Sequence, residues 1–269
     1  MTKQSIDYEA LNDQKQFYNS RFQEGYMQDF SDLYESCRLI AMKAILKQVK
    51  ASGFNPGTAL DYGCGEGRYI ELLNEFFPST SIFGSDISDT ALQIAQAKYP
   101  AGKYFTMSDE SVNFADNSFD LIISIEVLEH VRNVEKSIQE IGRLLKPEGM
   151  VIISTPCANK YSFEWFQNRL TGGLQPSFDG YGRFATDEPA HLRRLNDAYL
   201  KSLCSQAGID IYKIYHRAHL FETLVPKGRT FRLMPKVCVG LGMLDWHLFK
   251  HFSNGATMIA LGKKSKSVS

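Results

Sequence analysis

The segment 61–67 reads Asp-x-Gly-x-Gly-x-Gly and lies between a predicted buried strand and a predicted helix. Gly63, Gly65 and Gly67 allow the backbone to turn sharply and to approach a ligand without Cβ clashes. The unpaired amide groups at the start of the following helix can donate hydrogen bonds to a carboxylate. This glycine loop therefore predicts a binding site for a ligand that carries a carboxylate.

Two acidic residues follow the next two predicted strands. Asp86 lies 19 residues past Gly67, at the end of the second strand, and Asp109 follows the third. A carboxylate at Asp86 can accept hydrogen bonds from both hydroxyls of a ribose, each worth about 1.5–3 kcal/mol. Asp109 can accept a hydrogen bond from an adenine amino group. Because ligands of open α/β sheets bind beyond the carboxyl ends of the strands, these residues together predict a nucleoside cofactor.

Nicotinamide-dependent oxidoreductases are the main alternative class, because they also combine a glycine loop with an acidic residue. Their fingerprint is G-x-G-x-x-G. The sixth position is Arg68 when the reading starts at Gly63, and Ile70 when it starts at Gly65. The fingerprint fails in both frames, which disfavours this class. A tight turn without a ligand is the purely structural alternative.

Strand and helix patterns alternate along the chain, which is typical of a parallel sheet covered by helices on both faces. A helix with Ser31 as its N-cap is predicted over 32–50. Ser88 and Asn196 are the expected N-caps of two later helices. Seven strands are predicted, at 58–62, 81–85, 104–107, 119–125, 150–155, 209–215 and 256–262.

The chain is predicted to be one α/β domain over 1–269. Its N-terminal helical segment covers 1–50, and a cofactor-binding core covers 51–155. Two stretches, 156–194 and 216–255, interrupt the alternation of strands and helices. Long inserts after strands commonly build lids or substrate pockets, so acceptor specificity is expected there.

The composition disfavours several classes of protein. The chain has 269 residues, with 30 Lys and Arg against 30 Asp and Glu, so a nucleic-acid partner is not predicted. Five cysteines without a CxxC pair disfavour disulfides and zinc, and favour a reducing cytoplasm. The N-terminus shows no apolar leader, and the longest apolar run, 237–244, is shorter than the roughly 20 residues that cross a bilayer. A cytoplasmic protein without a transmembrane segment is predicted.

Further motifs extend the pattern beyond the glycine loop, at 59–67, 84–88, 114–122, 126–131 and 144–149. On these motifs the chain resembles the class I S-adenosylmethionine (SAM)-dependent methyltransferases over about residues 55–155. Within that class it is similar to the O-methyltransferases of ubiquinone biosynthesis. The resemblance implies a Rossmann-like, seven-stranded sheet that is mostly parallel, with an antiparallel last strand, and it implies SAM as the cofactor.

The resemblance also implies which residues bind the cofactor. The glycine loop would hold the methionine end of SAM, Asp86 the ribose, and Asp109 with Glu110 the adenine. Ile125 and Glu126 would lie near the sulfonium. The expected cofactor contacts are Asp61, Gly63, Cys64, Gly65, Gly67, Asp86, Ile87, Asp109, Glu110, Ile125 and Glu126.

Methyl transfer needs a base only when the acceptor keeps its proton. His130 is the best candidate, because an unperturbed histidine titrates near neutrality. Glu126 and His191 are further catalytic candidates, and a purely structural role is the alternative for both histidines. Glu126, Glu129 and His130 could bind a divalent metal, as a similar segment does in the ubiquinone-biosynthesis enzymes. The same string also occurs in methyltransferases without a metal, so no metal is predicted.

The predicted function is methyl transfer to a small-molecule or lipid-like acceptor, most simply at oxygen. Aromatic and basic residues in the inserts, such as Trp165 and Trp246, suit an apolar acceptor with a polar or negative group. These residues could instead form a lid core or touch a membrane surface. The cofactor mouth could be covered by four N-terminal residues, Tyr18, Arg21, Phe22 and Tyr26. A SAM-binding protein without turnover is the alternative function, and the oligomeric state is not predicted.

Overall fold

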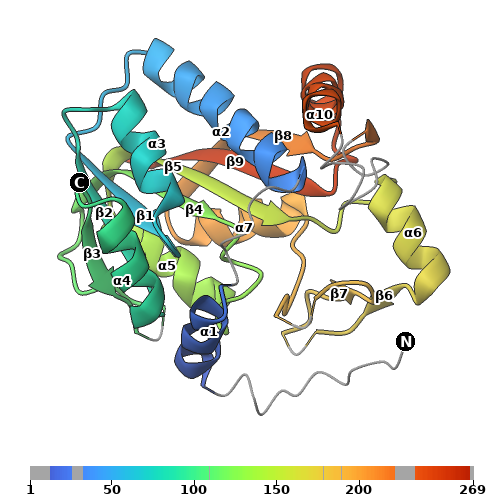
Figure 1. The fold of residues 1–269 in the computed structure, drawn as a ribbon, viewed down its shortest axis with the longest axis horizontal. Helices are drawn as coiled ribbons and strands as arrows, with labels where there is room; N and C mark the ends of the chain where they lie inside the picture. Colours follow the sequence, from blue (N-terminus) through green and yellow to red (C-terminus); the bar gives the residue numbers. More distant parts are fainter. Residues whose placement is uncertain are drawn as a thin grey trace.

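A computed structural model describes residues 13–25, 33–108, 110–177, 179–188, 190–221 and 234–266. Its centre is a seven-stranded sheet with the strand order β3-β2-β1-β4-β5-β9-β8 (Figure 1). The strands are β1 (Thr58–Tyr62), β2 (Ser81–Asp86), β3 (Lys103–Thr106), β4 (Phe119–Ile125), β5 (Leu145–Pro156), β8 (Ile209–Arg217) and β9 (Thr257–Lys264). β9 runs antiparallel to β5 and β8, and the other neighbouring pairs are parallel. The predicted Rossmann-like sheet is confirmed.

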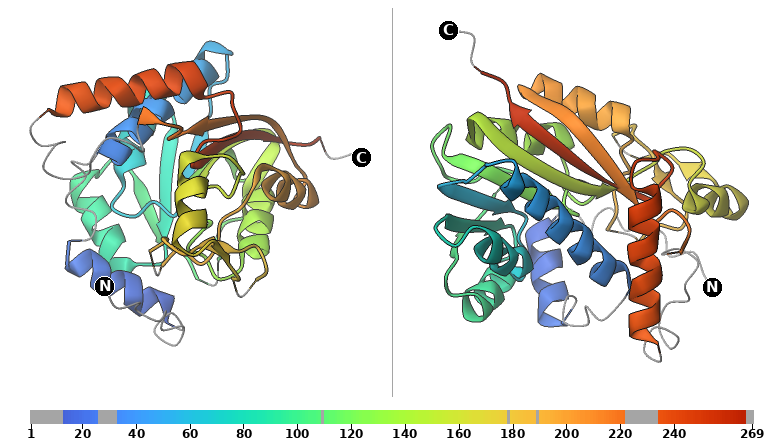
Figure 2. Two further views of the ribbon diagram at one scale, coloured as in Figure 1. Left: turned by 90° about the vertical axis from the view of Figure 1, so that its right-hand side faces the viewer. Right: turned by 90° about the horizontal axis from the view of Figure 1, so that it is seen from above.

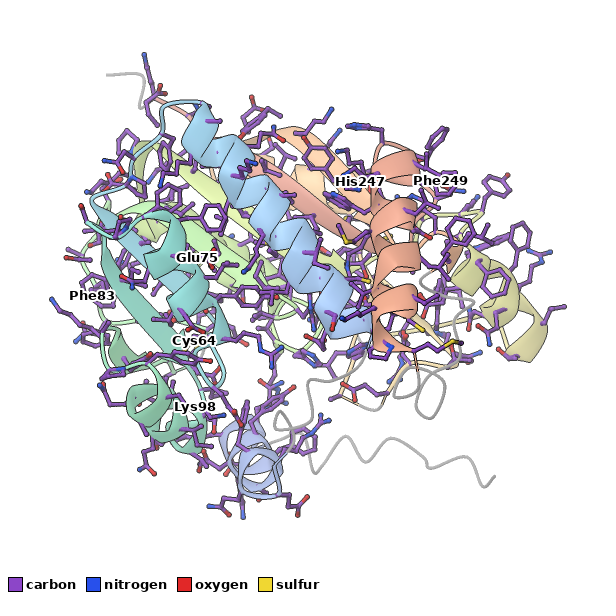
Figure 3. The ribbon with its side chains drawn as sticks, turned by 45° about the horizontal axis from the view of Figure 1, so that its top comes forward. Cys64, Glu75, Phe83, Lys98, His247 and Phe249 are labelled. Atoms are coloured by element: carbon purple, nitrogen blue, oxygen red, sulfur yellow. The ribbon has the colours of Figure 1, made fainter. Side chains whose placement is uncertain are left out.

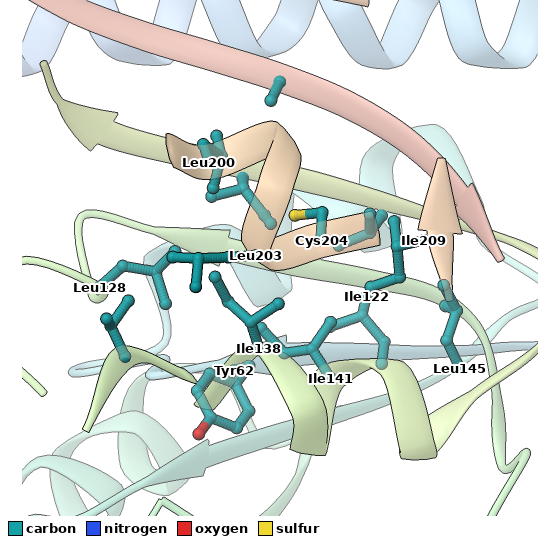
Figure 4. Close-up of a cluster of buried hydrophobic side chains, with 14 of the residues drawn as sticks. Tyr62, Ile122, Leu128, Ile138, Ile141, Leu145, Leu200, Leu203, Cys204 and Ile209 are labelled. Carbon is teal, nitrogen blue, oxygen red and sulfur yellow. The ribbon is translucent and has the colours of Figure 1, made fainter. Parts of the chain in front are cut away.

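Helices cover both faces of this sheet (Figure 2). They are α1 (Gln14–Gln23), α2 (Leu33–Ala51), α3 (Arg68–Phe76), α4 (Asp89–Lys98), α5 (Val134–Leu144), α6 (Phe163–Thr171), α7 (Asp197–Gln206) and α10 (Pro235–Phe249). Leu46 of α2, Ile70 of α3 and Trp246 of α10 share one apolar cluster. Ile138 of α5 and Leu200 of α7 belong to a second cluster (Figure 4). Each large apolar side chain that is fully buried in these clusters stabilises the fold by about 1.5–3 kcal/mol.

Local sequence signals set the helix boundaries. The Ser88 hydroxyl accepts a hydrogen bond from the Ala91 amide at 3.1 Å, and the Asn196 side chain accepts one from Tyr199 at 2.9 Å. Both predicted N-caps are therefore confirmed, each worth about 1 kcal/mol. The predicted cap Ser31 lies outside the described residues.

The two inserts differ in structure. The first contains α6 and a short hairpin of β6 (Leu174–Gln175) and β7 (Arg183–Phe184). The second contains α10, which packs against α2, and its Trp246 is only 5% exposed. Trp246 therefore packs in the core and does not face an acceptor. Within the described ranges, no helix is both long enough and apolar enough to span a bilayer.

Candidate active site

The glycine loop connects the end of β1 to the start of α3, and Figure 3 labels Cys64 in this loop. Gly63, Gly65 and Gly67 have φ angles of 80°, 51° and 83°, a region that favours glycine. A Cβ atom at Gly63 would lie 2.4 Å from Cγ2 of Val127. Gly67 precedes α3 and offers no side-chain cap, and the positive end of the helix dipole at this point favours an anionic ligand.

Two buried aspartates lie near the carboxyl ends of β1 and β2. Asp86 accepts hydrogen bonds from the amides of Gly65 and Ser88, both at 2.9 Å, so its carboxylate fixes the loop. Asp61 is 1% exposed, and its Oδ2 has no hydrogen-bond partner among the residues that the structure describes. Burial, together with the nearby carboxylate of Asp86, raises the pKa of Asp61 to about 8. A buried carboxyl of this kind favours a cationic ligand group beside it.

A cavity of about 860 Å³ joins the glycine loop to the carboxyl end of β4. It is lined by most of the predicted site residues, namely Gly63, Cys64, Gly65, Asp86, Ile87, Glu110, Ile125, Glu126, His130 and His191. Asp61 and Gly67 are not part of its lining. Asp109 lies outside the described residues. The volume is within the range of small-molecule and cofactor sites.

Glu110 lines the cavity, but its carboxylate has structural partners. Its Oε1 accepts hydrogen bonds from the amides of Arg132 and Asn133 at 3.1 and 3.2 Å. Its backbone carbonyl accepts a hydrogen bond from the Tyr62 hydroxyl at 2.6 Å. Glu110 therefore ties the end of β1 to the turn before α5, next to the expected adenine position.

Glu126 directly follows β4 and has a φ angle of 56°, a strained value for a residue other than glycine. The Ser154 hydroxyl donates to its Oε1 at 2.7 Å, and Nη1 of Arg38 lies 3.3 Å from its Oε2. Burial raises the pKa of Glu126, but the charges of Arg38 and Arg217 outweigh this effect and hold the pKa below its usual value. Glu126 is thus an ionised carboxylate in the cavity wall.

His130 presents its Nε2 to the cavity side of the same turn. Its Nδ1 lies 2.9 Å from the carbonyl oxygen of Ala190, which can only accept, so Nδ1 carries the ring proton. Nε2 then keeps its lone pair, 3.9 Å from Oε1 of Glu129. Burial, and to a smaller extent His191, lowers the pKa of His130 to about 3. Burial and the charge of Glu126 raise the pKa of Glu129 well above its usual range.

His191 comes from the first insert and packs edge-to-face on His130, with ring centroids 4.8 Å apart. Its Nε2 lies 3.3 Å from Oε1 of Glu188, and Nη2 of Arg21 lies 3.3 Å from the other Glu188 oxygen. Burial outweighs the charge of Glu188 and lowers the pKa of His191. The structure thus brings all three predicted catalytic residues, including Glu126, to one cavity.

Three side chains have the spacing of metal ligands, and they differ from the three that were considered from the sequence. The ligand atoms of Glu129, His130 and His191 lie within 4.8 Å of one another. Glu126, which the sequence grouped with Glu129 and His130, is held instead by Arg38 and Ser154. Each trio residue also has an outer partner: Thr155 for Glu129, Ala190 for His130 and Glu188 for His191. Such outer partners commonly orient metal ligands.

A buried arginine that sequence reasoning missed holds the turn of the catalytic candidates. Residues 190–194 run beside the turn 128–132, and the Leu192 amide donates to the carbonyl of Glu129 at 2.8 Å. Arg193 is 0% exposed, donates to three carbonyl oxygens of this turn at 2.5–3.1 Å and pairs with Asp179. The sequence does show two adjacent arginines shortly after His191. It does not show which groups they bind, because tertiary contacts bring those groups together.

Helix α1 lies across the cavity mouth. Gln14 donates to the carbonyl of His130 at 2.7 Å. The ring of Phe22 lies 3.5 Å from the point where a Cβ of Gly65 would stand. Tyr18 and Phe22 both line the cavity, so the N-terminal segment forms part of its wall. Tyr26, also expected there, lies outside the described residues.

Comparison with known proteins gives consistent matches. A family model described as a methyltransferase domain matches residues 60–153. A "probable S-adenosylmethionine-dependent methyltransferase" of Mycolicibacterium smegmatis is 28% identical over 166 residues, which cover 61% of this chain and 57% of the relative. A ubiquinone biosynthesis O-methyltransferase of Mesorhizobium japonicum is 28% identical over 36% of this chain and 39% of its own length. The chain spans about half the length of the curated methyltransferases of mycobacteria that it matches.

Solved structures share the fold across nearly the whole chain. A SAM-dependent methyltransferase from Thermotoga maritima has a TM-score of 0.59 at 18% identity, over 93% of this chain and 99% of that one. A Burkholderia thailandensis 1,6-didemethyltoxoflavin-N1-methyltransferase, solved with its substrate and S-adenosylhomocysteine, has a TM-score of 0.57 at 16% identity, over 99% of this chain and 93% of that one. Residues 60–153 thus match a methyltransferase domain, and the chain shares the fold of solved SAM-dependent methyltransferases.

Proposed function

We propose that this chain transfers a methyl group from SAM to an oxygen atom of a small, lipid-like or aromatic acceptor. The observation that carries the proposal is one cavity that joins the glycine loop and Asp86 to Nε2 of His130. SAM supplies an activated methyl group on a sulfonium, so the protein has to align the acceptor and exclude water. Alignment alone can supply about 7–11 kcal/mol.

The residues around the glycine loop suit SAM. In this proposal the unpartnered Oδ2 of Asp61 pairs with the ammonium of the methionine end, and the first amides of α3 bind its carboxylate. Each Asp86 oxygen accepts one backbone amide and keeps a second lone pair for a ribose hydroxyl. The adenine is assigned to Asp109 and Glu110, and the sulfonium to the region of Glu126.

His130 acts in this proposal as the general base. The Ala190 carbonyl fixes the tautomer that leaves Nε2 free to take the acceptor's proton. Burial lowers the pKa of His130, so its imidazole is neutral and can accept a proton, but it is a weak base; an acidic acceptor hydroxyl, such as a phenol or an enol, demands the least from it. Transfer to oxygen is also supported by the relatives named as ubiquinone biosynthesis O-methyltransferases. Glu126 and His191 then hold the acceptor and the imidazole in place.

A second reading assigns Glu129, His130 and His191 to a metal ion, because their ligand atoms converge. In that case Nε2 of His130 would bind the metal and could not act as the base. Adding a chelator distinguishes the two readings, because base catalysis is insensitive to it. If the chelator abolishes turnover and added magnesium restores it, the metal site, and not the general base, explains the role of these residues.

The domain assignment also remains a proposal. We infer that the whole chain acts as one methyltransferase domain, because β8 and β9 from its last third complete the sheet that begins at β1. The first insert supplies Glu164, Gln167, Thr186, Asp187, Glu188, His191 and Arg194 to the cavity wall, whereas the described part of the second supplies Ala218. This arrangement supports an acceptor site built mainly by the first insert.

Calorimetric titration with SAM, S-adenosylhomocysteine and NAD tests the cofactor. We expect SAM and its product to bind and NAD not to bind; tight NAD binding without SAM binding would refute the proposal. Asp86→Ala should abolish SAM binding, whereas Asp210→Ala on the exposed side of β8 should not. Turnover of SAM with a panel of phenols and enols then distinguishes an enzyme from a SAM-binding protein without activity.

A further inference from the structure

Exposed apolar side chains are concentrated in two parts of the molecule. Of the fifteen large apolar side chains that are exposed in the described part of the chain, eleven lie within 161–174 and 234–252. Single exposed apolar residues are common on proteins and need no explanation. Contiguous patches instead mark sites that bind another surface.

On α6, the exposed residues Phe163, Phe166 and Leu170 are spaced three and four apart, so they share one side of the helix. We call this side the α6 face; Leu170 is 88% exposed. On α10, Val237, Leu244 and Leu248 are spaced seven and four apart and are also exposed, and we call this side the α10 face. α10 buries Cys238, Gly242, Asp245 and Trp246 on its other side, whereas α6 buries Asn168 alone.

The chain segments next to the two helices are in contact. The turn after α10 contacts the residues before α6, because Asn254 donates to the carbonyl of Tyr161 at 3.5 Å. Tyr161 and Phe252, which are 66% and 59% exposed, lie in these two connecting segments and extend the apolar surface between the helices. Figure 2 (left) shows α6 near the centre of the view and α10 along its top, and Figure 3 labels His247 and Phe249 on α10.

The charges around these faces have one sign. The exposed Lys and Arg side chains within these segments are Arg169 and Lys236, and Lys160, directly before the first segment, is also exposed. The two acidic residues of these segments are paired or buried: Glu164 pairs with Arg194, and Asp245 is fully buried beside His219. The exposed charges of these segments are thus basic, although the formal charge of the whole chain is zero. Apolar side chains ringed by cations complement the acyl boundary and phosphates of an anionic bilayer.

We propose that the α6 face and the α10 face together dock on the surface of an anionic lipid bilayer. A dimer through the same faces would bring their cations together without exposed acidic partners, which disfavours a second copy of the chain. Because α6 also supplies Glu164 and Gln167 to the cavity wall, docking places the cavity mouth beside the bilayer. The inference itself does not depend on methyl transfer.

Flotation with lipid vesicles tests this inference without SAM or acceptor. The full chain should float with vesicles that contain phosphatidylglycerol, and much less with phosphatidylcholine alone. Phe166→Glu combined with Leu170→Glu should weaken partitioning at least about tenfold, as should Val237→Glu combined with Leu248→Glu. Lys160→Gln should weaken binding to anionic vesicles by about fivefold and flatten its salt dependence.

Tyr212→Glu is the matched control, because Tyr212 is also exposed (47%) but lies on β8, away from both faces. It should leave partitioning unchanged, and circular dichroism should show that every variant is folded. Absence of flotation with anionic vesicles would overturn the proposal. So would equal losses in the Tyr212 control. A wild-type dimer that the α6 and α10 variants dissociate, without vesicle binding, would assign the faces to a second copy.

Discussion

Substituting asparagine for Asp61 removes a buried ionisable group and keeps its size and polarity. The carboxyl has an ordinary pKa of 3.8 when exposed, and burial with the nearby Asp86 raises it to about 8 in the folded chain. A group whose folded pKa is raised contributes stability that is fully present below the unfolded value and is lost as the pH rises to the folded value. Asp61 therefore penalises folding increasingly between these two pH values.

The size of this penalty follows from the shift. Each pH unit between the two pKa values costs about 1.36 kcal/mol, so the wild-type chain should lose about 3 kcal/mol relative to Asp61→Asn when the pH rises from about 5 to about 7. Urea denaturation of both proteins at both pH values measures this difference. SAM binding, measured in parallel by calorimetry, should be lost, because the amide cannot balance an ammonium.

Asp245→Asn provides a control with the opposite sign. Asp245 is also fully buried, but His219 and backbone amides outweigh burial and lower its pKa. That substitution should therefore destabilise the chain at neutral pH. A stability difference between Asp61→Asn and wild type that stays constant from pH 5 to 7 would show that Asp61 is already ionised in the folded chain, and would refute the reasoning.

Three further substitutions test other parts of the site. His130→Gln should lower kcat by about 10²–10⁴-fold, the usual contribution of a general base, and chromatography of S-adenosylhomocysteine with a soluble acceptor measures it. Arg193→Met should lower the free energy of unfolding by about 3–5 kcal/mol in urea, because Asp179 and three carbonyls lose their buried cation. Gly63→Ala should weaken SAM binding in calorimetry at least about tenfold, because its Cβ would overlap Val127 at a φ of 80°.

Each of these results has a control on the same scaffold. His247→Gln lies on the exposed side of α10 and should leave kcat unchanged; an equal loss there would remove the case for His130 as base. For Arg193→Met the control is Lys201→Met on the exposed side of α7, which should change the free energy of unfolding by less than about 0.5 kcal/mol. Gly240→Ala meets nothing within 4 Å and should not affect SAM binding. Wild-type affinity in Gly63→Ala would contradict the close approach of the loop.

The sheet and the cofactor loop could be predicted because their signals are local. The run 119–125 is apolar almost throughout, so it had to be a central strand, and the glycines of 61–67 mark a turn that other residues adopt poorly. Ser88 and Asn196 cap their helices through side-chain oxygens that act within three residues. Such signals need no knowledge of the rest of the fold.

The partners of the catalytic candidates could not be predicted, because they lie far apart in sequence. Arg38 contacts Glu126 from α2, and His191 of the first insert packs on His130. The aromatic character of Trp246 suits either an acceptor contact or a packed core, and its side chain packs in the core with α2. Composition indicates that a side chain can bind an apolar partner, and tertiary structure decides which one.

The first insert couples acceptor recognition to the proposed chemistry. Five of its residues, Thr186, Asp187, Glu188, His191 and Arg194, line the cavity. The neighbouring residues Ala190 and Arg193 hold the turn 128–132, through hydrogen bonds to His130 and to the carbonyl oxygens of this turn. A change in this insert that reshapes the acceptor site would therefore also move Nε2 of His130. Acceptor range and kcat should therefore change together in variants of 186–194. Variants of α10 should change neither property when the acceptor is soluble.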